Sequence, residues 1–222
     1  LDVRTTWRIL RSFGVWAPEW ARRRIAPFHR SVGPFTADGF DPEAWKAEYP
    51  NTAFVNMRDD DAFWGARRGA AFTDRQLRLL AEQGRYGDPA ATAQVADALI
   101  GRRDSIAKTW LARITPLVSP TLERDRLRFE NAAVDAGVAT EPDTYVVQWS
   151  RFDNDSGTHA PVGPALEVQA PEALLPDVLA GAAFVAARVH AVHPRYPHWV
   201  TPVTFYFRRD GTSWTPVGLV RR

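Results

Sequence analysis

The chain has 222 residues, which is enough for one large domain or two small ones. Its 45% hydrophobic and 24% charged residues are typical of a folded protein rather than a disordered one. A formal net charge of +2 argues against the strong positive field of many nucleic-acid-binding proteins, so we expect no nucleic-acid partner. The lack of cysteine excludes disulfides and Cys-ligated metal sites, and no apolar run approaches the roughly 18 residues of a transmembrane segment.

The chain begins at Leu1, and its only methionine is Met57, which predicts a piece of a longer protein. Lysine occurs only at Lys46 and Lys108 among 28 basic residues. This preference for arginine is typical of a GC-rich genome and favours a bacterial source.

A short helix is predicted at the N-terminus, with Trp7, Leu10 and Phe13 on one apolar face and Gly14 as its end. The first thirty residues are rich in arginine (Arg4, Arg8, Arg11, Arg22, Arg23, Arg24 and Arg30) and contain only Asp2 and Glu19 as acidic residues. This basic stretch would suit a membrane surface or nucleic acid, but we favour a solvated stretch or one that contacts an acidic neighbour.

Four further helix starts are predicted between residues 41 and 89. Asp41-Pro42 supplies an N-cap and a proline at the first helical position, with Trp45 as the apolar anchor. The run Asp59-Asp60-Asp61 favours a helix start over a metal site, because unpaired N–H groups attract carboxylates there. Thr73 with Gln76 has capping-box spacing, and Asp88-Pro89 opens the longest helix, whose apolar stripe extends to Ile114 before Pro116.

After Pro120 the apolar residues alternate, which is typical of half-buried strands. We predict strands over 129–138, around Tyr145, Val147 and Trp149, at Leu166 and Val168, over 184–192, around Val203, Phe205 and Phe207, and after Asp210-Gly211. The segment 153–157 is predicted to be a turn rather than a calcium loop, because it lacks the EF-hand glycine and glutamate spacing.

The fold class is therefore α+β in two parts. Residues 1–116 are predicted to be an all-helical segment belonging to a larger domain. Residues 121–222 are predicted to be an antiparallel β-sandwich of the immunoglobulin or fibronectin III type, because about six short strands in about a hundred residues suit that fold.

The only cluster of catalytic-type side chains consists of His190, His193 and His198. Three imidazoles suit zinc or copper, but residues three apart on a strand point to opposite faces, so a metal site is the weaker interpretation. Among the nine tryptophans, Trp199 lies in a proline-rich loop beside His198, and we expect it to be the most exposed of them. Trp199 and Tyr196 are our candidates for contact with a ligand or partner. No catalytic or cofactor-binding residue is identified, and no cofactor is expected.

A series of short motifs extends from residue 40 to residue 116 at characteristic spacing. They are Phe40-Asp41-Pro42, Tyr49-Pro50-Asn51-Thr52-Ala53-Phe54, Asp61-Ala62-Phe63-Trp64-Gly65-Ala66, Ala71-Phe72-Thr73-Asp74, Gly84-Arg85-Tyr86-Gly87-Asp88-Pro89 and Leu99-Ile100-Gly101-Arg102-Arg103-Asp104-Ser105-Ile106. This stretch resembles the C-terminal portion of a group of exported bacterial proteins whose upstream region is kinase-like.

The resemblance implies that residues 1–116 are similar to the helical lobe of a kinase-like fold. It also implies that any catalytic residues precede Leu1, that the upstream part of the same protein is a partner, and that the protein is exported to the periplasm or the exterior. The sequence leaves a cytoplasmic location open.

Three functions follow from these observations. We favour a non-catalytic C-terminal part of an exported kinase-like protein, with the sandwich as an accessory or interaction module. The first alternative is a module that binds a carbohydrate or a protein through aromatic side chains of the sandwich. The second is a His-dependent metalloenzyme.

Overall fold

The computed structural model describes residues 3–13, 15–16, 27–47, 49 and 51–221. Gly14 and Arg22 to Arg24, which the sequence interpretation used, lie outside the described residues. The chain divides into two compact units, Leu1–Phe40 with Asp74–Gly101, and Asp41–Thr73 with Arg102–Arg222. The second unit contains helical residues as well as the strands, and the predicted limits of 1–116 and 121–222 stay a prediction.

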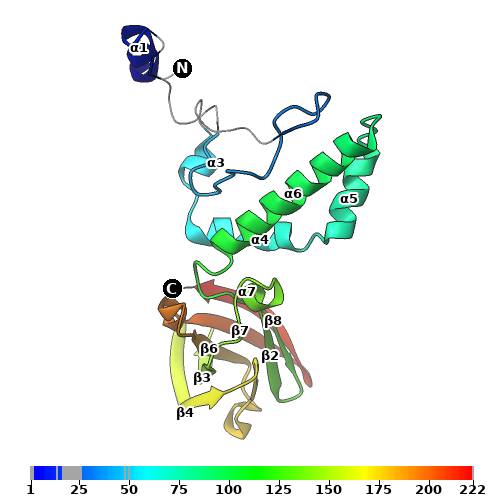
Figure 1. Ribbon diagram of the computed structural model, residues 1–222. Helices are drawn as coiled ribbons and strands as arrows, with labels where there is room; N and C mark the ends of the chain where they lie inside the picture. The colour runs from blue at the N-terminus through cyan, green and yellow to red at the C-terminus, as the bar shows by residue number, and fades with distance from the viewer. Residues whose placement is uncertain (1–2, 14, 17–26, 48, 50, 222) are drawn as a thin grey trace. The chain divides into compact units, whose positions relative to one another are not determined.

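The first unit contains α1 (Val3–Arg11), α5 (Asp74–Gln83) and the first part of α6 (Pro89–Trp110). Figure 1 shows α5 alongside α6, and Ala81 of α5 packs with Val95 and Ala96 of α6. The predicted start of α6 is confirmed, because the Asp88 carboxylate accepts a hydrogen bond from the Ala90 N–H at 2.7 Å.

A loop over residues 29–37 is fixed to α6 by side-chain hydrogen bonds. The Gln94 amide donates to the carbonyls of Gly33 and Phe35 at 3.0 and 3.1 Å. The His29 Nε2 lies 3.2 Å from an Asp88 carboxylate oxygen. Gly101 is required at its position, since a Cβ there would lie 2.5 Å from the Ala37 Cβ.

The helices of the second unit are α3 (Thr52–Val55), α4 (Asp59–Ala70) and the last part of α6. The predicted helix start at Asp59 is confirmed, and the Asp61 carboxylate accepts from the Arg58 N–H at 3.1 Å. The helix expected after Asp41 is wrong: Asp41 caps a single turn through the Glu43 N–H at 2.9 Å. Trp45 was expected to anchor this helix through its apolar side chain. In the structure its ring packs on Phe54 instead.

The remaining described chain forms two antiparallel sheets joined by short helices. One sheet has the order β1-β2-β5 and the other β4-β3-β6-β7-β8. The strands are β1 (Leu117–Glu123), β2 (Arg126–Asn131), β3 (Thr144–Asp153), β4 (Thr158–Val168), β5 (Glu172–Leu174), β6 (Phe184–Val192), β7 (Val203–Asp210) and β8 (Ser213–Arg221), and the short helices are α7 (Ala132–Asp135), η1 (Asp177–Leu179) and η2 (Pro197–Val200). Helices followed by an antiparallel sandwich confirm the predicted fold class at this level.

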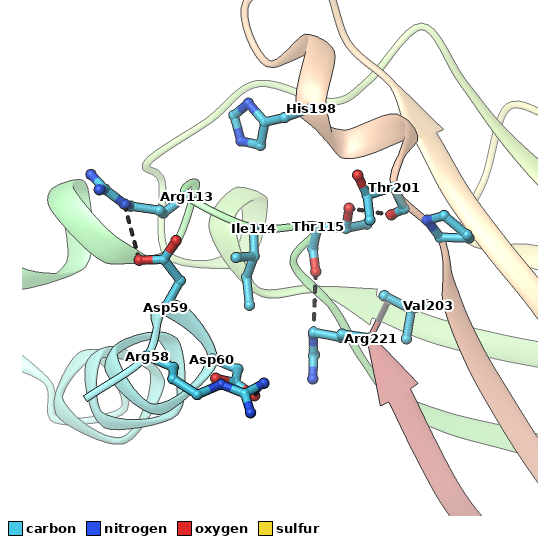
Figure 2. A pocket seen from close by; sticks show the side chains of 11 residues that line it. Arg58, Asp59, Asp60, Arg113, Ile114, Thr115, His198, Thr201, Val203 and Arg221 are labelled. Carbon is cyan, nitrogen blue, oxygen red and sulfur yellow. Dashed lines mark hydrogen bonds and ion pairs between the residues drawn. The ribbon is translucent and has the colours of Figure 1, made fainter. Parts of the chain in front are cut away.

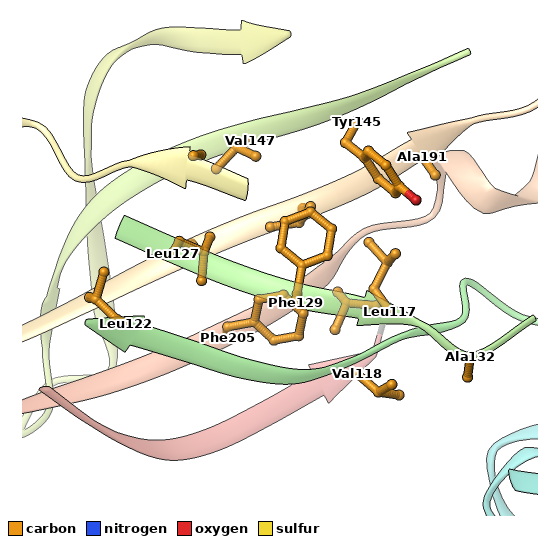
Figure 3. Close-up of a cluster of buried hydrophobic side chains, with 14 of the residues drawn as sticks. Leu117, Val118, Leu122, Leu127, Phe129, Ala132, Tyr145, Val147, Ala191 and Phe205 are labelled. Atoms are coloured by element: carbon orange, nitrogen blue, oxygen red, sulfur yellow. The ribbon is translucent and has the colours of Figure 1, made fainter. Parts of the chain in front are cut away.

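The two sheets pack face to face through aromatic side chains. Phe129 of β2 lies 5.2 Å from the ring of Tyr145 and 6.0 Å from that of Phe205, measured between ring centroids. Figure 3 shows Leu127 and Phe129 directed toward the larger sheet. The predicted inward residues of β3 and β7 are confirmed, since Tyr145, Val147, Trp149, Val203, Phe205 and Phe207 are all at most 1% exposed.

Two strand predictions need correction. The segment 129–138 is a strand only as far as Asn131, where a buried side chain caps α7 by accepting from the Ala133 and Val134 N–H groups. The strand β1 was not predicted, because Pro116 and Pro120 indicated a linker. It tolerates Pro120 through an irregularity in its pairing with β2, at which Ser119 adopts a φ of 50°.

Candidate functional site

A pocket of about 420 Å³ lies within the second unit, where α4 begins, α6 ends and β8 closes the larger sheet. Figure 2 shows its side chains, which come from four separate segments of the chain. They are Arg58, Asp59, Asp60, Arg113, Ile114, Thr115, His198, Thr201, Pro202, Val203 and Arg221. This pocket is our candidate binding site, since ligand sites are concave and combine apolar walls with a few fixed polar groups.

The first wall is the N-terminus of α4, where two aspartates are held by arginines. The Arg58 guanidinium donates to the Asp60 carboxylate at 3.0 Å. Arg113, from the segment after α6, donates to Asp59 at 3.2 Å and also pairs with Glu43. Both aspartates of this wall therefore have a cationic partner, although these pairs are exposed and stabilise the fold only weakly.

The opposite wall is Arg221, near the end of β8. Its guanidinium donates to the carbonyls of Leu117 at 2.9 Å and Thr115 at 3.5 Å, and it lies 4.9 Å from the centre of the Phe63 ring. No carboxylate of the described residues lies within ion-pair distance of it. Burial, and then the nearby Arg67, lower the pKa of Arg221 to about 10. The Asp60 carboxylate acts in the opposite direction and raises this pKa. Arg221 is thus a partly desolvated positive charge that forms no ion pair within the described residues.

The floor of the pocket is the short helix η2, which hydrogen bonds tie to the end of α6. The Trp199 Nε1–H and the His198 Nε2–H both donate to the Ala112 carbonyl, at 3.0 and 2.7 Å. The buried Thr115 hydroxyl lies within hydrogen-bond distance of the carbonyls of Trp199 and Thr201. These bonds fix the positions of His198 and Thr201 before any ligand arrives.

The structure corrects the expected exposure of Trp199. Its side chain is 0% exposed, and its ring stacks on Tyr196 at 4.7 Å with an interplanar angle of 17°. The proline-rich sequence indicated a surface loop, but η2 folds inward and the indole becomes part of the core. Tyr196 is half-buried against Trp199.

The three histidines occupy different environments. His190 lies on the outer face of β6, whereas Val189 and Ala191 face the core, and its pKa is lowered by burial and by Arg188. His193 is buried and uses both ring nitrogens, since Nδ1 accepts from the Arg195 N–H and Nε2 lies 3.2 Å from the Thr140 hydroxyl. Over the part of the chain that the structure describes, no group of three potential metal ligands occurs.

A second feature that was not predicted is an aromatic cluster on the outer face of the larger sheet. The ring centroid of Phe152 lies 4.8 Å from Tyr206 and 5.0 Å from His159, and the Tyr206 hydroxyl is 3.3 Å from the His159 Nε2. The hairpin turn predicted at 153–157 brings Phe152 and His159 opposite each other across the two strands. The alternation of Phe152 and Tyr206 with core residues was the signal that could have indicated this cluster.

Comparisons of the chain with protein-family models, with curated proteins and with solved structures find no match. Among the described residues, no helix has both the length and the apolar character needed to cross a membrane.

Proposed function

We propose that this chain is a non-catalytic interaction module, and that its second unit binds a small anionic group in the pocket beside Arg221. The observation that carries the proposal is the Arg221 guanidinium, which is partly buried and has no carboxylate partner among the described residues. Arg58 and Arg113, the other two arginines of the pocket, already form ion pairs with carboxylates, so Arg221 is the arginine available to an incoming anion. A carboxylate or phosphate of a ligand would supply the missing counter-charge, because a guanidinium binds both through paired N–H groups.

The strand order supports a finer assignment of the sandwich to the immunoglobulin or fibronectin III type. Lettered in chain order, β1, β2 and β5 correspond to strands A, B and E of such a sandwich. The strands β4, β3, β6 and β7 then correspond to C′, C, F and G, and β8 is an additional edge strand. Modules of this architecture occur in many cell-surface proteins, where they serve recognition rather than catalysis.

The larger context of the module rests on the motif resemblance between residues 40 and 116. On that basis we propose an accessory part of an exported bacterial kinase-like protein, with the upstream part of the same protein as a partner. Export, a bacterial source and kinase-like ancestry are supported by the resemblance and the arginine-rich composition alone.

The aromatic cluster favours a second candidate function, binding of a carbohydrate. Half-buried Phe152 and Tyr206 and exposed His159 present ring surface on the outer face of the sheet, and sugar rings stack on such surfaces. A glycan array with the intact protein and with Tyr206→Ala tests this candidate. Carbohydrate binding requires that the intact protein bind at least one glycan and that Tyr206→Ala abolish this binding.

The anion site can be tested by nuclear magnetic resonance on protein labelled with ¹⁵N-arginine. Inorganic phosphate and sodium acetate are titrated separately, and the Arg221 Nε–H signal is expected to shift saturably with at least one of them. Arg221→Gln should abolish the saturable response of the remaining pocket arginines. The matched control Arg209→Gln, which removes an exposed arginine of the same sheet, should leave the Arg221 response unchanged.

A second variant tests whether removal of a negative charge strengthens anion binding. This test remains valid even if Arg221→Gln does not fold. Asp60→Asn removes a negative charge from the pocket wall, so it should strengthen phosphate binding several-fold. Absence of a saturable shift in the intact protein would contradict the proposal, as would an Asp60→Asn variant that binds phosphate more weakly.

A further inference from the structure

The helix α1 in the first unit carries a large apolar face that is exposed. Val3 is 80% exposed, Trp7 65% and Leu10 64%, and Phe13 just after the helix is 96% exposed. Scattered exposed apolar residues are ordinary, but four large ones within eleven consecutive residues are unusual. The sequence predicted Trp7 and Leu10 on one apolar face, but Phe13, which was expected to share it, lies beyond the end of the helix. The exposure of this face is a finding of the structure.

The helix is too short to be stable in water without a partner. It has nine residues, and isolated helices shorter than about 12–15 residues are marginal even when their sequences favour helix formation. Most helices of this size are stabilised by packing of their apolar face. Something must therefore cover Val3, Trp7 and Leu10 when α1 is fully formed.

The charges on α1 indicate what that cover is. At 3.6 residues per turn, Val3, Trp7 and Leu10 fall within an arc of about 60°. Arg4, Arg8 and Arg11 fall within an adjacent arc of similar width, and residues 3–13 contain no acidic residue. Trp7 is the apolar residue closest to the arginines. This order, an apolar stripe bordered by tryptophan and then by arginine, matches the depth profile of an anionic bilayer surface.

We propose that α1 is an interfacial helix that binds a membrane surface containing anionic phospholipids. Its apolar stripe inserts at the level of the acyl chains, and its arginines reach the lipid phosphate groups. The apolar side chains differ in shape and stand on a convex helix surface. A bilayer accepts them without the shape complementarity that a protein groove would need.

Sedimentation with lipid vesicles tests the proposal on the whole chain. Vesicles of phosphatidylcholine and phosphatidylglycerol in equal parts should bind the protein, and vesicles of phosphatidylcholine alone should bind it much more weakly. Binding to the anionic vesicles should fall steeply as salt is raised, because the lipid charge is screened. Each arginine near such a surface contributes about fivefold in affinity, so the double variant Arg8→Gln, Arg11→Gln should lose about 25-fold.

Two further variants separate the membrane from other occupants of the apolar face. Trp7→Ser with Leu10→Ser should abolish vesicle binding while all arginines remain. The charge-matched control Arg124→Gln, Arg151→Gln alters two exposed arginines of the sandwich and should leave binding within about twofold.

The proposal would be overturned if the α1 variants bound anionic vesicles as strongly as the control variant does. It would also be overturned if the intact protein did not bind anionic vesicles at low salt. A change of oligomeric state with Trp7→Ser, Leu10→Ser, measured by light scattering without vesicle binding, would also overturn it and assign the face to a second copy of the chain.

Discussion

Replacing Trp199 by alanine tests the main difference between the expected and the observed position of this residue. The indole is fully buried, stacks on Tyr196 and meets the His193 ring edge-on at 5.0 Å. Loss of a buried tryptophan costs about 3–5 kcal/mol, because both transfer free energy and packing contacts disappear. A protein of this size has about 5–15 kcal/mol of total stability, so the change should shift the unfolding midpoint strongly.

Trp199→Phe separates the contribution of the indole hydrogen bond to stability from that of the ring packing. The smaller ring keeps most of the packing but loses the 3.0 Å hydrogen bond to the Ala112 carbonyl. About 1 kcal/mol is expected for the hydrogen bond and about 1 kcal/mol for the lost ring surface, so this variant should be destabilised by about 2 kcal/mol. Ala112 keeps its hydrogen bond from His198, which limits the penalty for an unsatisfied carbonyl.

Urea unfolding followed by circular dichroism measures these differences. Val200→Ala is the matched control, since Val200 is the next residue of η2 and is 52% exposed, so it should cost less than about 0.5 kcal/mol. If Trp199→Ala were no more destabilised than Val200→Ala, the indole would be at the surface as the sequence suggested. The hydrogen-bonded floor of the pocket would then be wrong as well.

Three further predictions concern the sandwich. Phe205→Ala should cost about 3–5 kcal/mol in urea unfolding and Tyr206→Ala much less, since Phe205 is buried and Tyr206 faces outward; the reverse order would mean an inverted strand. His190 has a lowered pKa in the folded state because of burial and Arg188, so the unfolded state binds more protons below the ordinary histidine pKa. Stability should therefore fall as the pH decreases from about 6.5, and His190→Gln should reduce that slope; an unchanged slope would assign it to other groups. Asn131→Ala should cost about 1–2 kcal/mol through loss of the α7 cap, and a thermal denaturation midpoint equal to that of the unaltered protein would contradict this.

The sequence predicted those elements whose physical signal is local. Alternation is a property of consecutive residues, and the alternation of Tyr145, Val147 and Trp149 with Val146, Gln148 and Ser150 indicated both the strand and its buried face. The acidic run at Asp59 and the Asp88-Pro89 pair indicated helix starts in the same way. Where a local signal had two meanings, the interpretation was wrong: Pro120 indicated a linker but lies in a strand.

The candidate site depends instead on contacts between residues far apart in the chain. The Trp199 indole reaches a carbonyl 87 residues earlier, and Arg221 reaches carbonyls 104 and 106 residues earlier. No spacing rule relates such positions. The proximity of Arg221 to Leu117 and Thr115, for example, arises because β8 of the larger sheet contacts β1 of the smaller one. The proline-rich segment around Trp199 therefore looked like a surface loop in the sequence.

The same reasoning explains why the two proposed binding features differ in how they could be found. The amphipathic pattern of α1 is fully present in eleven consecutive residues, and only the exposure of its apolar face needed the structure. The anion pocket cannot be predicted from any short stretch of sequence, because its charge balance depends on which arginines form ion pairs in the folded chain. Arg58 pairs with Asp60, and Arg113 pairs with Asp59 and Glu43, whereas Arg221 forms no ion pair within the described part of the chain. The chemical character of the pocket therefore follows from the geometry of these pairs and not from the number of charged residues in the sequence.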